Sequence, residues 1–186
     1  PMSLRPANTP DLSTPPLELP AGLEPENPLW RFALALWKFP GVQDNCLALQ
    51  NQGWSLTPVL CAGWLALSGR AFTGVEDATV TEWRDRVTGA LRSARKSLPG
   101  NAGRCQKLRT GIAGLELEAE QMELALAWRT LMTNNPEQSD MQGLDTLIRT
   151  NLAAAAPASR IDDRAGPLLN ALGTALANFP KGDHQP

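Results

Sequence analysis

The segment from about Ala102 to Asn134 constrains the fold most, because it has the pattern of one long helix with apolar residues on two opposed sides. One seam consists of Leu108, Ile112, Leu115, Ala119, Met122 and Leu126. The opposite seam consists of Leu117, Leu124, Trp128 and Leu131. A helix that is apolar on two sides must be covered on both. We expect the N-terminal helices to cover one seam, and either the C-terminal segments or another protein chain to cover the second.

Capping and breaking residues divide the rest of the chain into further helices. Asn27-Pro28 starts the first helix, which is apolar nearly all round over residues 29–37 and is therefore expected to be central. The periodicity then predicts helices over residues 42–52, 55–69, 79–98, 140–155 and 166–179. Two-residue alternation long enough for a strand does not occur.

These patterns predict an all-α protein: a single-domain bundle of about five to seven helices around a long central hairpin, residues 79–98 and 102–134. The helical domain is expected to span residues 27–179. Residues 1–26 hold seven of the sixteen prolines and are expected to be a disordered or surface-draped tail. Residues 180–186 are expected to be a flexible tail.

Several common catalytic arrangements are excluded by composition. The chain has one histidine, His184, which cannot support a Ser-His-Asp triad, a Cys-His pair or a multi-histidine metal site. The three cysteines lack paired CxxC spacing and fit small buried residues in a reducing cytoplasm. We therefore expect no enzyme activity, no cofactor, no metal and a cytoplasmic location. No apolar run reaches the roughly 20 residues that span a bilayer, so no membrane segment is expected.

Three glutamates share one face of the long helix, at i, i+4 and i+7: Glu116, Glu120 and Glu123. Such carboxylates can bind metal or perform acid–base chemistry, but the di-iron pattern also needs Glu-x-x-His pairs that the chain lacks. A solvated acidic strip is the favoured interpretation.

Basic residues concentrate between Arg84 and Arg109, where eight cations face one acid, Asp85. The candidate patch consists of Arg84, Arg92, Arg95, Lys96 and Arg104. It could meet phosphates or an acidic protein surface. Pairing with neighbouring glutamates is favoured over a ligand patch, so nucleic acid is the less favoured partner.

Five of the six tryptophans lie in the N-terminal half of the predicted domain, at helical spacing that is typical of a core. Trp54 differs because Gly53-Trp54-Ser55 places it on a turn. An exposed tryptophan there would be an interface anchor.

The series Leu29-Trp30-x-Phe32-Ala33-Leu34-x-Leu36, then Pro40-Gly41-Val42 and Cys46-Leu47-x-Leu49-Gln50, resembles a small proteobacterial family described only as conserved and of unknown function. The resemblance continues through Trp64-Leu65, Trp83-Arg84 and Leu115-Glu116-x-Glu118-Ala119-Glu120, and covers roughly residues 28–131. It implies cytoplasmic proteins and supplies no catalytic residues.

The favoured function is a non-enzymatic cytoplasmic adaptor or regulatory protein that acts through helical surfaces, by binding another protein or itself. The candidate interface residues are Leu117, Leu124, Trp128, Leu131 and Trp54. One alternative is a carrier of a small apolar ligand, with a tryptophan-lined pocket between the first three helices. The other is an RNA- or ribosome-associated factor that uses the basic 84–109 helices.

Overall fold

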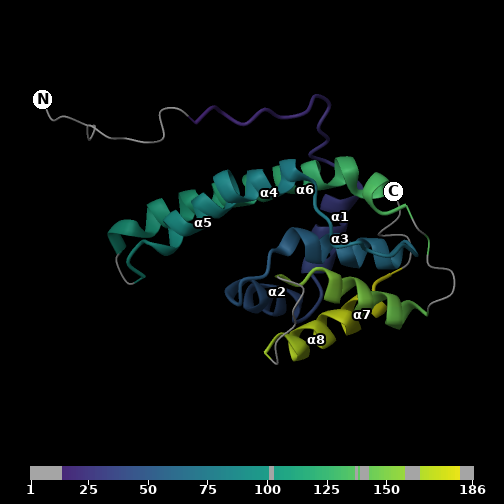
Figure 1. Cartoon of the computed structure of the whole chain (residues 1–186). Coiled ribbons are helices and arrows are strands. Elements are labelled where there is room, and N and C mark those ends of the chain that lie inside the picture. Colours follow the sequence, from purple (N-terminus) through teal and green to yellow (C-terminus); the bar gives the residue numbers. More distant parts are fainter. Residues whose placement is uncertain (1–13, 101–102, 137, 139–142, 158–163, 181–186) are drawn as a thin grey trace, which may run out of the picture.

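A computed structural model describes residues 14–100, 103–136, 138, 143–157 and 164–180 of the chain. These residues form an all-α single domain, as predicted. The elements are α1 (Pro28–Trp37), α2 (Val42–Asn51), α3 (Leu56–Leu67), α4 (Ala78–Trp83), the π-helical turn η2 (Arg84–Thr88), α5 (Gly89–Lys96), the short 3-10 turn η3 (Gly103–Cys105), α6 (Gln106–Asn134), α7 (Leu144–Ala154) and α8 (Ala165–Ala177). Their arrangement is shown in Figure 1.

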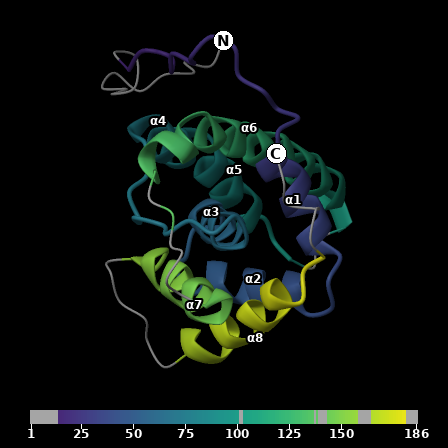
Figure 2. The ribbon, with the colours of Figure 1, turned by 90° about the vertical axis from the view of Figure 1, so that its right-hand side faces the viewer.

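Helix α3 is the centre of the fold. Its residues are buried almost continuously from Thr57 to Ala66, and it packs against α1, α2, α6 and α7. In Figure 2 α3 is seen nearly end-on, with the other helices around it. The expectation that the 29–37 helix is central is therefore wrong, because α1 buries Leu29, Phe32 and Leu36 but leaves Leu34 exposed.

The predicted long hairpin is present, and one arm is more complex than a single α-helix. Asp77 caps the first arm by accepting from the Thr79 amide at 3.1 Å. That arm continues through α4, η2 and α5, and α6 returns antiparallel to it. The end of this hairpin, formed by α5 and the first half of α6, extends beyond the rest of the protein on the left of Figure 1.

The second seam of α6 is covered by the chain itself. Leu124 and Leu131 are buried in the core, and Trp128 packs edge-on against Trp64 of α3 with ring centroids 5.2 Å apart. The covering helices are α1 and α3, whereas α7 and α8 pack against α3 and α2. The expectation that C-terminal segments or another chain cover this seam is thus wrong for its second half. Leu117, which lies two helical turns before Leu124, remains exposed.

The C-terminal pair is joined to the rest of the fold by the buried side chain of Asn151. Its Oδ1 accepts from the Phe72 amide at 3.0 Å, and its Nδ2 donates to the carbonyls of Ala62 and Arg70. Helix α8 packs mainly on α2 and α7, and its Leu176 also lies against Gly63 of α3. One amide side chain therefore holds α7, α3 and the loop before α4 together.

Residues 14–26, which fall within the predicted tail, lie along the outer side of α4 and α6 (Figure 1). Arg86 donates to the Pro15 carbonyl at 2.6 Å and Gln121 donates to the Pro25 carbonyl at 3.1 Å. These two hydrogen bonds join residues 14–26 to the hairpin. Residues 1–13 and 181–186 lie outside the described part of the chain.

Candidate functional site

A cleft of about 190 Å³ lies where α1, the start of α3, the α4–α5 arm and α6 meet. Its lining residues are Trp30, Ala33, Leu34, Trp37, Gln50, Ser55, Leu56, Thr57, Leu60, Arg84, Thr88, Arg92, Leu117, Glu120, Glu123 and Leu124. Most of this lining is apolar. The cleft is open to solvent, and two of its residues, Leu34 and Leu117, are 46% and 54% exposed.

The apolar wall comes mainly from one face of α1. Trp30, Leu34 and Trp37 follow one another at spacings of four and three residues, which places them on one side of a helix. Both tryptophans are partly buried and pack against the core while they line the cleft. Two of the tryptophans predicted as core residues therefore also form the wall of a cleft.

The polar wall is part of a ladder of charged side chains, of which Arg84, Arg92, Glu120 and Glu123 line the cleft. We define this Arg–Glu ladder as Glu76, Arg84, Arg92, Arg95, Glu116, Glu120 and Glu123. At its inner end, Arg84 donates to both oxygens of Glu76, at 2.9 and 2.6 Å, and its Nε donates to Glu123 Oε2 at 3.0 Å. The Thr57 hydroxyl donates to the same Glu123 oxygen at 2.5 Å. Glu123 is thus buried with partners from α3 and from the hairpin.

At the outer end of the ladder, two arginines of α5 contact two glutamates of α6. Arg95 pairs with both oxygens of Glu116. Arg92 Nη2 donates to Glu120 Oε1 at 3.2 Å, and its Nε lies 3.8 Å from Glu116 Oε1. Glu116 is buried, whereas 41% of the Glu120 side chain is exposed. Glu120 is therefore the least covered carboxylate that lines the cleft.

Two pKa shifts follow from this arrangement. Burial alone lowers the pKa of Arg84, but the hydrogen bonds and negative charges of Glu76 and Glu123 outweigh it and raise the pKa further above its usual range. Burial raises the pKa of Glu120, the nearby Glu116 and Glu123 raise it further, and Arg92 opposes both. The ionised form of Glu120 is therefore less stable in the folded protein than the ionised form of a glutamate in water.

The π-helical turn sets which residues of the hairpin face the cleft. Residues spaced by four drift by about 40° per step in a regular α-helix, and a wider π turn offsets this drift. Arg84, Thr88 and Arg92 consequently all line the cleft. Gly89 closes the turn by donating its amide to the Arg84 carbonyl. A Cβ at Gly89 would lie 2.8 Å from that carbonyl oxygen, so the turn requires glycine there.

Thr88 is buried in the wall of the cleft. Within the described part of the chain its Oγ1 has no hydrogen-bond partner. A buried hydroxyl without a partner is uncommon in a native fold and calls for an explanation.

The structure overturns the expectation of a solvated acidic strip, because Glu116 and Glu123 are buried and paired with arginines. The arginines that pair with the strip are Arg84, Arg92 and Arg95, so the favoured internal compensation of the basic patch is confirmed for these three. Its other two residues, Lys96 and Arg104, are exposed near the end of the hairpin.

The predicted interface residues lie in different environments: some line the cleft and others are buried in the core. Leu117 lines the cleft and is exposed. Leu124 lines the cleft from the core, Leu131 is buried, and Trp128 packs on Trp64. Trp54 is only 4% exposed and belongs to the core, so it is not the exposed anchor that its turn position suggested. The cleft itself was missed, apart from the alternative of a tryptophan-lined pocket between the first three helices.

Among the described residues, no group of three or more His, Cys, Asp and Glu side chains is placed to hold a metal ion. Cys46 and Cys61 are buried, as predicted, and burial raises the pKa of the Cys46 thiol to about 12. At neutral pH it is therefore an unreactive thiol. None of the helices in the described ranges could cross a membrane.

Comparison with known proteins identifies the family of the chain. A family model described as a protein of unknown function, DUF2390, matches residues 28–149, which include every residue that lines the cleft. No curated protein and no solved structure is significantly similar to the chain. The match agrees with the resemblance seen in the sequence and extends it into α7. The chain belongs to the DUF2390 family of proteins of unknown function.

Proposed function

We propose that the protein is a non-enzymatic adaptor and that the cleft is the site where it binds another protein. The observation that carries the proposal is the half-open apolar cleft with Leu34 and Leu117 exposed on its lining. Leucines left exposed beside an apolar depression are typical of a surface that a partner covers. Partially buried tryptophans next to them supply the pocket that an anchoring side chain fills.

The size of the cleft favours a protein partner over the small-ligand alternative. Its volume of about 190 Å³ is close to the ~150 Å³ of an engineered cavity that holds one benzene molecule. Pockets for drug-sized ligands have volumes of about 300–1,000 Å³. One or two side chains of a partner therefore fill this cleft, whereas a lipid or a large cofactor does not fit.

The state of three of the four ladder carboxylates supports a non-enzymatic role. Glu76, Glu116 and Glu123 are each engaged by arginine, and a carboxylate held in this way is a poor general base. We also propose a cytoplasmic location, since Cys46, Cys61 and Cys105 are free and two of them are buried.

Site-specific photocrosslinking tests the proposal. A benzoylphenylalanine replaces Leu34 or Leu117 in the full chain, and a control replaces Leu144, an exposed leucine of α7 that does not line the cleft. We expect both cleft positions to capture the same protein and Leu144 not to capture it. The captured protein is then purified and titrated calorimetrically against wild type and Leu117→Asp, with an expected loss of affinity of at least about tenfold for an interface anchor.

The same experiment also distinguishes self-association from binding to another protein, and shows whether docking occurs at the cleft at all. A crosslinked dimer of the chain from both cleft positions would identify the partner as a second copy. Equal capture from all three positions, or unchanged affinity of Leu117→Asp, would contradict docking at the cleft.

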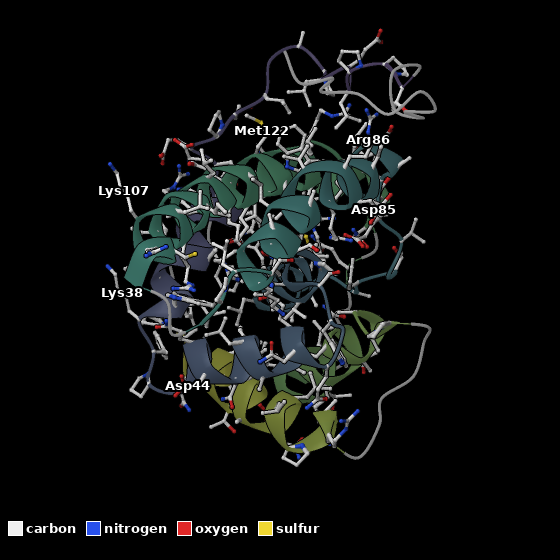
Figure 3. All side chains as sticks on the ribbon, turned by 90° about the vertical axis from the view of Figure 1, so that its left-hand side faces the viewer. Lys38, Asp44, Asp85, Arg86, Lys107 and Met122 are labelled. Atoms are coloured by element: carbon white, nitrogen blue, oxygen red, sulfur yellow. The ribbon has the colours of Figure 1, made fainter. Side chains whose placement is uncertain are left out.

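One observation favours nucleic acid as a second candidate partner. No acidic residue occurs between residues 86 and 115, and Lys96, Arg104 and Lys107 make no ion pair with any described residue. These three side chains are exposed at the projecting end of the hairpin, and Figure 3 shows Lys107 pointing away from the protein. We define them as the basic tip.

Salt-dependent binding tests this candidate. If the basic tip binds phosphates, the affinity for a 20-nucleotide single-stranded RNA falls with salt with a log–log slope of about −2, since about 0.7 counterions are released per contact. Lys107→Glu reduces the slope, whereas Arg31→Glu on exposed α1 leaves it unchanged. Binding that is independent of salt, or absent, would exclude this candidate.

A further inference from the structure

The Arg–Glu ladder is not charge-balanced. It contains four carboxylates, Glu76, Glu116, Glu120 and Glu123, and three guanidinium groups. Of the ladder residues, Arg84, Arg92, Glu120 and Glu123 line the cleft, and the other described lining groups are uncharged. One carboxylate of the ladder as a whole therefore has no guanidinium of its own among the described residues.

Glu120 is the ladder carboxylate with the fewest contacts among the described residues. Glu76 is held by both terminal nitrogens of Arg84, Glu123 by Arg84 and Thr57, and Glu116 by Arg92 and Arg95. Among the described residues, Glu120 is contacted only by Arg92, through Oε1, and Arg92 shares its charge with Glu116. No described residue donates a hydrogen bond to the second oxygen of Glu120. That oxygen belongs to the most exposed carboxylate on the lining of the cleft.

A second, independent feature of the wall lacks a partner. The hydroxyl of Thr88, which is buried between Arg84 and Arg92 on the hairpin arm, has no hydrogen-bond partner in the part of the chain that the structure describes. A hydroxyl offers two lone pairs to an N–H donor. Both the charge at Glu120 and the hydroxyl at Thr88 thus fit a ligand that carries a positive charge and several N–H donors.

We propose that the cleft accepts a lysine side chain of the protein partner, with its ammonium group at Glu120. The inference rests on the proposed docking function and names the chemistry that the cleft recognises. An ammonium group is a compact charge with three donors, whereas a guanidinium binds best to two free oxygens of one carboxylate. Glu120 has one free oxygen, which suits the ammonium.

The apolar wall suits the rest of such a side chain. Lysine buries its four-carbon stem on apolar surface while its charged end contacts polar groups. Trp30, Leu34 and Trp37 provide that surface in the same cleft as the carboxylate. The faces of the tryptophan rings also attract a cation. The cleft therefore matches both the stem and the ammonium of one lysine.

The test compares two matched probes on the full chain. The charged probe is Nα-acetyl-lysine N-methylamide, and the neutral probe is Nα-acetyl-norleucine N-methylamide, which has the same stem without the ammonium. Binding is followed at pH 7 by the indole N–H resonances of Trp30 and Trp37, assigned with Trp→Phe variants. We expect the lysine probe to bind about fivefold more tightly, which is the upper range for a partly exposed ion pair.

Two variants locate the effect. Glu120→Gln is expected to abolish the preference for the lysine probe while norleucine binding stays the same. Glu118→Gln removes an exposed carboxylate of α6 that does not line the cleft, and is expected to keep the preference.

Equal binding of the two probes to wild type, a preference that survives Glu120→Gln, or no shift with either probe would overturn the lysine assignment. Photocrosslinking from Leu34 and Leu117 does not depend on the ammonium, so it still reports on docking in each of these cases. A failure of the lysine assignment is therefore distinguishable from a failure of the proposed function.

Discussion

The hydroxyl of Thr57 donates a 2.5 Å hydrogen bond to Glu123 Oε2, the oxygen that Arg84 contacts at 3.0 Å. Thr57 lies at the start of α3, the most buried helix, and Glu123 lies in the middle of α6. A buried carboxylate costs stability unless charge and hydrogen bonds compensate it. The hydrogen bond from Thr57 therefore links α3 to the hairpin through the buried carboxylate of Glu123.

Thr57→Val tests this relationship. The variant keeps the shape of the side chain and removes the hydroxyl, so we expect a loss of about 1–3 kcal/mol in the free energy of unfolding, measured by urea denaturation. Thr57→Ser keeps the donor and is expected to lose less. If valine and serine were equally destabilising, the methyl group and not the hydrogen bond would be the important part of the residue.

Gly89→Ala tests the π-helical turn. Its Cβ would lie 2.8 Å from the Arg84 carbonyl oxygen, so the turn must distort, and we expect a loss of about 1–3 kcal/mol. Gly114→Ala is the matched control, because a Cβ there meets open space within α6. We expect that control to gain about 0.5–1 kcal/mol. Thermal melting followed by circular dichroism compares the two, and a stable Gly89→Ala protein would show that the turn tolerates a side chain.

Leu117→Asp and Leu124→Asp separate the surface of the cleft from the core beneath it. Leu124 is buried, so an aspartate there is expected to cost about 3–5 kcal/mol and to unfold much of the protein. Leu117 is exposed, and its variant is expected to change stability by less than about 0.5 kcal/mol. Urea midpoints measure both. A strongly destabilised Leu117→Asp would mean that Leu117 packs more tightly than its exposure indicates.

The pH dependence of stability tests Glu120. Its pKa in the folded protein is raised above the ordinary 4.5, so the protonated form favours folding and ionisation opposes it. The contribution is complete below the ordinary pKa and is lost as the pH rises through the raised value. We expect Glu120→Gln to gain stability relative to wild type as the pH rises from about 4 to 8.

Glu118→Gln is the control for the pH experiment, since Glu118 is exposed on the same helix. Its stability difference from wild type is expected to change little over the same pH range. An advantage of Glu120→Gln that is largest at low pH would show that Arg92 compensates Glu120 fully.

Local sequence signals predicted the helices well because capping is a short-range effect. Asn27 caps α1 by accepting from the Trp30 amide at 2.8 Å, and Asp77 caps α4. Gly53 and Gly69, which follow α2 and α3, both have positive φ. The π-helical turn was not predictable in this way, because the 79–98 stripe of apolar residues is compatible with a regular helix.

The acidic strip shows why the site was predicted less well than the fold. Glutamates at i, i+4 and i+7 give the same pattern whether the face is solvated or paired with arginines of another helix. The difference depends on how the α4–α5 arm lies against α6, where Trp83 Nε1 donates to the Ala119 carbonyl at 2.9 Å. That contact spans 36 residues, and no local pattern encodes it. The cleft likewise depends on where α1 lies against the hairpin.

The packing of α7 on α3 has a consequence for how the chain folds as it is synthesised. Asn151 bonds to the Ala62 carbonyl, 89 residues earlier in the chain. Local contacts favour fast folding of helical domains, and this contact is not local. At about 5–20 residues per second, α3 leaves the ribosome roughly 5–20 seconds before α7. During that interval the apolar side of α3 that packs against α7 is exposed to solvent. Chaperones that bind nascent chains could bind this surface.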